Sequence, residues 1–420
     1  MTAWTPDIRI EYLAPGVDHL EIGTVIDGWI DYSISATRGS ADYITPPYPM
    51  STTVTLLFDE NQIPDIELGS WLTIGVYTPT TGTWSPIHSG NVTDMTSSYR
   101  AYGLSGFVLE WQLNLTSAIS VLQNMTWYNE ANYTAPTDDC VIKVYNELGR
   151  AQWNQVNATT SWENIGGMDW LSFDDPVIYT LPSIFSYGIE STSQTLTAGY
   201  RNVWDDLTTL VYGVYGFMYE QAWGAIDIIY SDPTTPIVNE LTLTQEMLNT
   251  DITGGQAINE VRNVVTIIEF DAVESTYYDH ESISNYTQRI GSLNSYMNTT
   301  LEAANVGQKI LSGLAFPVLA TKQVSVNLLN PIFSDVDREA LLYYPLGKRI
   351  TVEAPSPMGG TLDYITVGCQ FDITKDAFIL SLTLAPYSQA WNTPNWQQIP
   401  YNYTWDSYGV AFPTQRWMDL

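Results

Sequence analysis

The sequence predicts a mainly β protein with α+β parts, and three observations lead to that fold class. Aromatic residues are dense, with 15 Trp and 28 Tyr in 420 residues, and Thr, Val and Ile are abundant. β-Branched and aromatic side chains pack well on a pleated surface. Several short segments also alternate between apolar and polar residues, with turn residues between them, as expected of half-buried strands.

The first part of the chain, residues 1–115, is predicted to be a small β-barrel or sandwich. Apolar residues alternate with Asp and Ser in its first strand, and polar turns follow the second and third strands. Short strands at regular spacing are typical of both architectures. The strands are expected at residues 30–35, 53–58, 71–77, 87–92 and 106–115.

Residues 116–190 are predicted to form an inserted, aromatic-rich lobe. It begins with a short helix at 116–122, capped by Thr116 or Ser117, and then shows little periodicity. Trp-rich β modules bind sugars by ring stacking, but Trp is also enriched in cores and subunit interfaces, which is the interpretation we favour. The candidates for glycan contact or for an interface are Trp127, Trp153, Trp162 and Trp170.

Residues 191–260 are predicted to be a helix-plus-hairpin subdomain. Apolar residues from Leu196 to Val211 fall at helical spacing, and two strand-like runs follow at 215–219 and 225–230.

Residues 261–390 return to strands, with one intervening helix at 299–314 that has a capping-box-like start and is stopped by Pro317. The last segment, 391–420, is expected to be an extended arm that needs a partner surface. The strands of this part are expected at 261–270, 323–329, 349–353, 364–371 and 378–384.

Charge and cysteine content exclude several classes of protein. With 46 acidic and 15 basic residues the chain carries a net charge of −31, which disfavours nucleic-acid and anionic-lipid binding. Cys140 and Cys369 lie far apart, so we expect two buried free thiols and no disulfide scaffold or Cys-rich metal site. No signal peptide or membrane span is expected, and the protein is expected to be made in the cytoplasm.

No motif for catalysis is found, and we expect no catalytic residue, metal or cofactor. The histidines, His19, His88 and His280, are far apart, and His88 is expected to be a packed or surface residue of a strand. A glycan hydrolase would need a carboxylate pair across a cleft. The acidic clusters are better explained as a turn at Asp174–Asp175, a solvated helix side at Asp205–Asp206 and a cap at Asp335, beside further acids at Asp169 and Asp337.

Four segments, in order, resemble the hub or minor tail proteins of tailed bacteriophages, a group that includes the baseplate hub of contractile tails. The first contains TVTLLF, IELGSWLTI and IHSGNV, similar to the strands of that family's opening barrel. The second, starting with NVWDDL, resembles its helix and short hairpin. The third contains AINEVRNVV and SISNYTQR, and the fourth runs from LGKRITV to LSLTLAP, like the closing barrel. These segments lie at 53–92, 202–230, 257–289 and 346–386.

The resemblance covers about residues 30–390 and implies two tail-tube-like β-barrels, joined by the helix-hairpin parts. It implies a homotrimer whose barrels form a ring that continues the tail tube at the virion tip and gates DNA passage. The implied partners are other copies of the chain, a distal tail protein, the tape-measure protein, and tail-tip or receptor-binding proteins. A carbohydrate- or receptor-binding β module of a virion is the alternative function, and a glycan hydrolase is the second alternative.

Overall fold

The structure is a computed structural model of the 420-residue chain. The residues that it describes are 4, 6–15, 24–59, 66–78, 83–101, 107–125, 133–135, 138–140, 143–144, 190–191, 194–196, 202–222, 226–229, 239–249, 252–268, 274–297, 300–343, 346–354 and 360–387.

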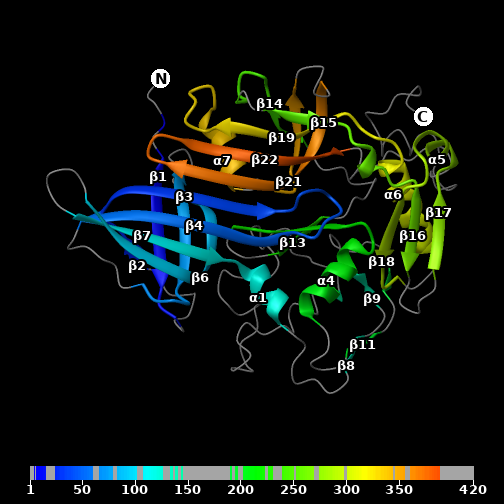
Figure 1. Cartoon of the computed structure of the whole chain (residues 1–420), viewed down its shortest axis with the longest axis horizontal. Coiled ribbons are helices and arrows are strands. Elements are labelled where there is room, and N and C mark those ends of the chain that lie inside the picture. Colours follow the sequence, from blue (N-terminus) through cyan, green and yellow to red (C-terminus); the bar gives the residue numbers. More distant parts are fainter. Residues whose placement is uncertain are drawn as a thin grey trace.

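A 13-stranded sheet dominates the molecule and occupies the left and upper parts of Figure 1. One group of its strands comes from residues 7–116, and neighbours within that group run antiparallel. In spatial order this N-terminal group is β2 (Thr24–Ile26), β1 (Asp7–Leu13), β5 (Trp71–Thr78), β6 (Thr83–Ala101), β7 (Phe107–Thr116), β4 (Tyr48–Asp59) and β3 (Trp29–Gly39).

The C-terminal group continues the same sheet. Its strands are antiparallel neighbours apart from β14 and β20, which run parallel. In spatial order they are β15 (Thr253–Gly255), β19 (Ala320–Asn327), β22 (Phe378–Pro386), β21 (Thr361–Thr374), and then β20 (Arg349–Glu353) and β14 (Asn239–Leu243) on a branch from β21.

Alternation along the strands builds the core. In β4 the side chains of Val54, Leu56 and Phe58 are fully buried, while Thr55 and Leu57 between them are half-buried. β22 repeats the pattern, with Leu380 and Leu382 among its fully buried residues. Each such side chain contributes roughly 1.5–3 kcal/mol when it leaves water.

The two groups meet where β21 pairs with β3. Residues 368–374 of β21 pair with β3, while its residues 361–365 pair with β20. A β-bulge lies between Thr366 and Gly368 at the point of exchange, and Ser40 N–H donates to Val367 O at 2.8 Å. Gly39 has φ +92° there, and a Cβ on it would lie 2.4 Å from Val367 O. Only glycine fits this approach.

Smaller elements lie beside the large sheet. The hairpin of β12 (Phe217–Glu220) and β13 (Ile226–Ile229) follows α4 (Val203–Tyr212), and α1 (Ala118–Asn124) packs against α4 and β4. Asn202 caps α4 by accepting from Trp204 N–H at 2.8 Å. The remaining short elements are β8 (Tyr133–Ala135) paired with β11 (Gln194–Leu196), β9 (Asp138–Asp139) paired with β10 (Glu190–Ser191), and the 3₁₀ turn η2 (Ile258–Glu260).

A separate layer, here called the three-stranded module, lies on the right of Figure 1. It consists of β17 (Glu274–Tyr278), β16 (Val264–Ile268) and β18 (Ile290–Asn294), with α6 (Thr300–Leu314) packed on one face and α5 (His280–Tyr286) joining β17 to β18. A Cβ on Gly307 of α6 would lie 2.3 Å from the ring of Tyr277, so the helix can approach the sheet closely only with glycine there.

Trp4, near the N-terminus, packs against residues of the C-terminal group and of α7. Its ring lies 5.6 Å from that of Phe378, and the guanidinium of Arg338 lies 5.0 Å from its centroid. Arg338 belongs to α7 (Asp335–Tyr343) and also donates to Leu328 O at 2.9 Å. The chain start is therefore anchored by stacking and cation–π contacts.

The expected fold class is confirmed in its coarser form, because the chain is mainly β with α+β parts. All five strands expected before residue 116 are present, as are the hairpin and the helix expected at 299–314. Two separate closed barrels are not seen within the described residues. The strands of both regions form one sheet, whose path runs from β15 to β2 without closing. It curls nonetheless, since Thr52 of β4 contacts His88 of β6 with β7 between their strands.

One local expectation, the start of a helix, was wrong, and two elements, α5 and β1, were not foreseen. The helix expected from Leu196 begins only at Val203, because Leu196 pairs with Tyr133 in a short ladder. Residues 280–286 form helix α5, capped by Asp279, which accepts from Ser282 N–H at 2.8 Å. Strand β1, which pairs with β5 along its whole length, was not foreseen. Ser117 is the N-cap of α1 as expected, but its side chain makes no cap bond.

Candidate functional site

The aromatic candidates for glycan contact lie outside the described residues. This applies to Trp127, Trp153, Trp162 and Trp170, and likewise to His19 and to the acidic cluster of Asp169, Asp174 and Asp175. The glycan hypothesis therefore stays a prediction.

The remaining acidic candidates have structural contacts. Asp205 is exposed as expected, but Asp206 is buried, which corrects the interpretation of the pair as a solvated helix side. The hydroxyl of Tyr296 donates to Asp206 Oδ1 at 2.9 Å. Asp335 begins α7 and pairs with Arg338 at 2.9 Å.

Among the described residues there is no group of three or more His, Cys, Asp or Glu that could hold a metal ion. None of the helices in that part of the chain is long and apolar enough to cross a bilayer.

A buried polar cluster lies beside the junction of β3 and β21. Arg38 Nε donates to Cys369 Sγ at 3.2 Å, and the guanidinium lies 5.7 Å from the ring centroid of Phe371. His88 Nδ1 and Thr52 Oγ1 form a hydrogen bond of 2.8 Å. His88 is thus a packed strand residue, one of the two outcomes expected. Both cysteines are free and buried, as expected.

Burial sets the protonation of this cluster. Burial, and the charge of Arg38, lower the pKa of His88 to about 3, so its imidazole is neutral at physiological pH. Burial raises the pKa of the Cys369 thiol, although Arg38 opposes the shift. The thiol therefore stays protonated, and a neutral histidine and thiol beside one cation make a structural cluster, not a nucleophile.

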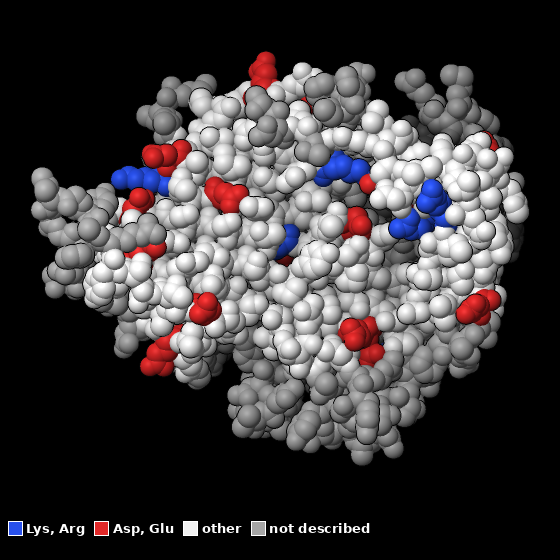
Figure 2. All heavy atoms as spheres, in the orientation of Figure 1, with Lys and Arg blue, Asp and Glu red and all other residues white. Residues whose placement is uncertain are grey.

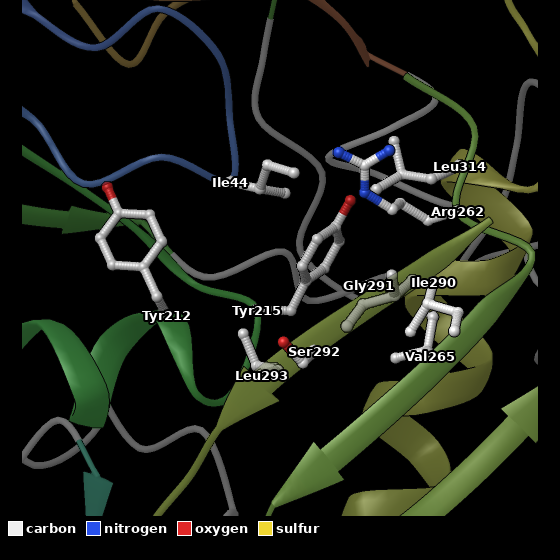
Figure 3. Close-up of a pocket in the computed structure, with 11 residues that line it drawn as sticks. Ile44, Tyr212, Tyr215, Arg262, Val265, Ile290, Gly291, Ser292, Leu293 and Leu314 are labelled. Atoms are coloured by element: carbon white, nitrogen blue, oxygen red, sulfur yellow. The ribbon is translucent and has the colours of Figure 1, made fainter. Parts of the chain in front are cut away.

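A cavity of about 330 Å³ lies between the end of α4 and the three-stranded module. Figure 3 shows that Tyr215 and Arg262 point toward each other, with Ile44 to their left and residues 291–293 of β18 below. Its walls come from segments far apart in sequence: Ile44 after β3, Tyr212 and Tyr215 at the end of α4, Arg262 and Val265, residues 290–293 of β18, and Ile310 and Leu314 of α6.

Local packing fixes the aromatic side of the cavity. Tyr215 has φ +60°, a rare conformation for a residue with a Cβ, and its ring lies 5.5 Å from that of Tyr43. Burial raises the pKa of Tyr215 and that of Tyr212, with Asp42 adding to both shifts, so both hydroxyls stay protonated. Lys309 of α6 places its ammonium 5.7 Å from the ring centroid of Tyr215.

The basic side of the cavity is Arg262. Its Nη1 donates to the backbone oxygens of Asn259 at 2.6 Å and Val261 at 2.9 Å. A Cβ on Gly291 would lie 3.0 Å from Arg262 Cδ, so the arginine stem lies flat on the glycine. Within the described residues Arg262 makes no ion pair with a carboxylate.

Charge is unevenly distributed over the face that contains α6. Figure 2 shows basic side chains near its centre, over the region where Figure 1 places α6, and at the left edge, with acidic side chains beside some of them and others spread over the top, left, lower and right parts.

Two solved structures share the fold of this chain. A tail protein from Neisseria meningitidis MC58 matches with a TM-score of 0.56 and 14% identity, over 92% of this chain and 98% of that chain. The 43 kDa tail protein of prophage MuSo2 from Shewanella oneidensis matches with a TM-score of 0.55 and 11% identity, over 91% of this chain and 99% of that chain.

A scan against protein-family models and a search of curated proteins found no match. The resemblance to tail proteins expected from the sequence is confirmed at the level of the fold.

Sequence reasoning missed the cavity. Its residues come from five separated segments, and no local pattern connects Ile44 with Arg262. Charge gave no signal either, because Glu260 lies only two residues before Arg262.

Proposed function

We propose that this chain is a structural protein of a virion tail, and that it acts as a hub or baseplate component at the tail tip. The observation that carries the proposal is the fold itself. It is shared with a tail protein over 92% of this chain and 98% of that chain.

The mechanism proposed is mechanical. One chain carries two β groups side by side, joined through β3 and β21. Three such chains would contribute six β groups to one ring, which could continue a six-fold tail tube onto a three-fold tip. The net charge of −31 suits a lumen through which DNA passes, since fixed positive charge would retain phosphates.

The proposed partners are further copies of the chain, a distal tail protein, the tape-measure protein and tail-tip or receptor-binding proteins. The chain would be made in the host cytoplasm and would act in the virion without turnover of a substrate. In this function the ring holds the end of the tape-measure protein and opens when DNA leaves.

The test is the mass of the purified full chain in solution, followed by electron cryo-microscopy of the particle, alone and with the distal tail protein. We expect a particle of three times the 47.1 kDa chain mass, with three-fold symmetry and a central hole wide enough for duplex DNA. A chain that stays monomeric under both conditions contradicts the hub proposal.

A glycan screen separates the hub from the carbohydrate-module alternative. Sugar binding by a monomer, lost on Trp162→Ala, would favour a receptor-binding module over a hub. Hydrolysis of a glycan, abolished by changing one carboxylate, would favour the hydrolase alternative.

A further inference from the structure

The cavity at the three-stranded module combines features of a peptide-binding pocket. Its volume of about 330 Å³ is close to the size at which ligand pockets begin, roughly 300 Å³. Tyr215, Leu293 and Leu314 give it an aromatic and aliphatic wall. Arg262 faces Tyr215 and lies beside Leu314, as Figure 3 shows, and its guanidinium has backbone acceptors only for Nη1.

A second arginine adjoins the cavity. Asn263 and Val264, which follow Arg262, both donate their N–H groups to Arg289 O at 3.1 Å, so the two arginines lie at the starts of paired parallel strands. Arg289 Nε is buried and has no hydrogen-bond partner. Neither arginine forms an ion pair with a described residue.

Exposed apolar side chains extend from the cavity. Ile290 is 63% exposed and Ile44 is 38% exposed, although both also line it. Tyr278, at the other edge of the three-stranded module, is 50% exposed and stacks on His280 at 6.0 Å. The surface therefore fits a segment with a carboxylate next to a large apolar side chain.

The chain itself has a segment of that chemistry. Residues 388–420 hold Trp391, Trp396, Trp405 and Trp417, with two acidic residues and one basic residue, and Trp405 is followed directly by Asp406. This segment lies outside the described residues, and its chemistry is known from its sequence.

A chain of contacts links the start of the segment to the basic side of the cavity. Pro386 pairs with Tyr364, whose hydroxyl accepts from Thr321 N–H at 2.9 Å. The next residue, Lys322, forms an ion pair of 2.5 Å with Glu260, two residues before Arg262. From Tyr387 to Trp405 there are enough residues to cover roughly 60 Å when extended, so one chain can reach its own cavity or that of a neighbouring copy.

We propose that this cavity is the docking site for the aromatic, acidic segment 388–420, with Trp405 in the apolar pocket and the Asp406 carboxylate on Arg262. Arg289 adds a second positive charge next to Ile290, which lines the cavity. The segment comes from the same chain or from a neighbouring copy, and the recognition is identical in either case.

The test is hydrogen–deuterium exchange of the full chain, read on peptides that cover residues 399–410. Arg262→Gln and Asp406→Asn are each expected to raise exchange there at least about tenfold, as the loss of a charge-assisted hydrogen bond predicts. Lys375→Gln, in an exposed turn far from the cavity, is the matched charge control and is expected to change nothing. The double variant Arg262→Glu with Asp406→Arg is expected to restore protection.

Two further measurements keep the test decisive. Ile290→Ser changes a mostly exposed side chain and is expected to raise the same exchange even if Arg262→Gln weakens the fold. Dilution separates the two sources, because protection by a neighbour falls with concentration and protection within one chain does not. Exchange of 399–410 at the rate of the free synthetic peptide in the unchanged chain, or no response to Arg262→Gln and Ile290→Ser, overturns the proposal.

Discussion

Gly39 offers the sharpest test of how the two strand groups are joined. It ends β3 at φ +92°, and a Cβ on it would lie 2.4 Å from Val367 O and 2.6 Å from Gly368 Cα. Gly39→Ala therefore meets a disfavoured conformation and a backbone clash together. The conformation costs about 1–2 kcal/mol and overpacking about 1–3 kcal/mol. We expect the free energy of unfolding to fall by about 2–5 kcal/mol.

Two other glycines separate these contributions. Gly360 has φ +73° with nothing within 4 Å of an added Cβ, so Gly360→Ala is expected to cost only the conformational part, about 1–2 kcal/mol. Gly255 also has open space and no positive φ, and Gly255→Ala is expected to stabilise by up to about 1 kcal/mol through the unfolded chain. The assay is urea unfolding of each variant. If Gly39→Ala unfolds at the same midpoint as Gly255→Ala, the close approach of β3 to β21 is wrong.

Three further variants test the buried contacts. Tyr296→Phe removes the hydroxyl that donates to Asp206 at 2.9 Å, and is expected to lower the free energy of unfolding by about 1–3 kcal/mol in urea titrations; an unchanged midpoint would contradict the buried bond. For His88 the folded pKa of about 3 lies below the ordinary value of 6.5. The unfolded chain therefore binds the extra proton between these values, and stability falls as pH is lowered from 6.5 toward 3, by at most about 1.4 kcal/mol per pH unit from this group. His88→Asn should flatten that slope when unfolding is measured between pH 4 and 7, and an identical slope would count against burial of the neutral ring. Trp4→Ala removes the ring between Phe378 and the Arg338 guanidinium, and is expected to lower the melting temperature and to speed proteolysis of the first residues; equal proteolysis rates would show that the anchor is not formed.

Local periodicity predicted the strands well because their burial alternates. Val54, Leu56 and Phe58 face the core with Thr between the first two, so their strand was visible in sequence. Capping chemistry likewise located the helix that became α6. Both signals depend only on neighbours within a few residues.

The joining of the sheet could not be predicted from local signals. β3 and β21 pair across more than three hundred residues, and their contact depends on Gly39 meeting a bulge at Gly368. β1 was missed although its sequence, DIRIEYL, alternates between charged and apolar residues, the period-2 pattern of a half-buried strand. We predicted that Asp206 is exposed because its partner, Tyr296, lies 90 residues further along the chain, and no local pattern predicts that contact.

Some features of the candidate site could likewise be predicted from the local sequence, and others could not. The place of His88 in a strand was predicted from the local sequence, and the free cysteines were predicted from their wide spacing. The cavity required three layers to meet, and its most informative residue, Arg262, has no local motif around it.

The junction also bears on how a ring of such chains could open. Residues 368–374 of β21 pair with β3 on one side and with β22 on the other, so the two strand groups share a continuous hydrogen-bonded ladder. Separating them would break many backbone hydrogen bonds at once, whereas separating two subunits need not. We therefore expect opening to occur at subunit boundaries.

A cross-strand disulfide tests that expectation. Thr37 and Gln370 are directly paired, and Thr37→Cys with Gln370→Cys would lock the two strands together. Virions assembled with the oxidised variant are expected to release DNA at the normal rate, and the reduced form is the control. Slower release from the oxidised virions alone would show that the two strand groups move apart within one chain, because the crosslink restrains no other motion.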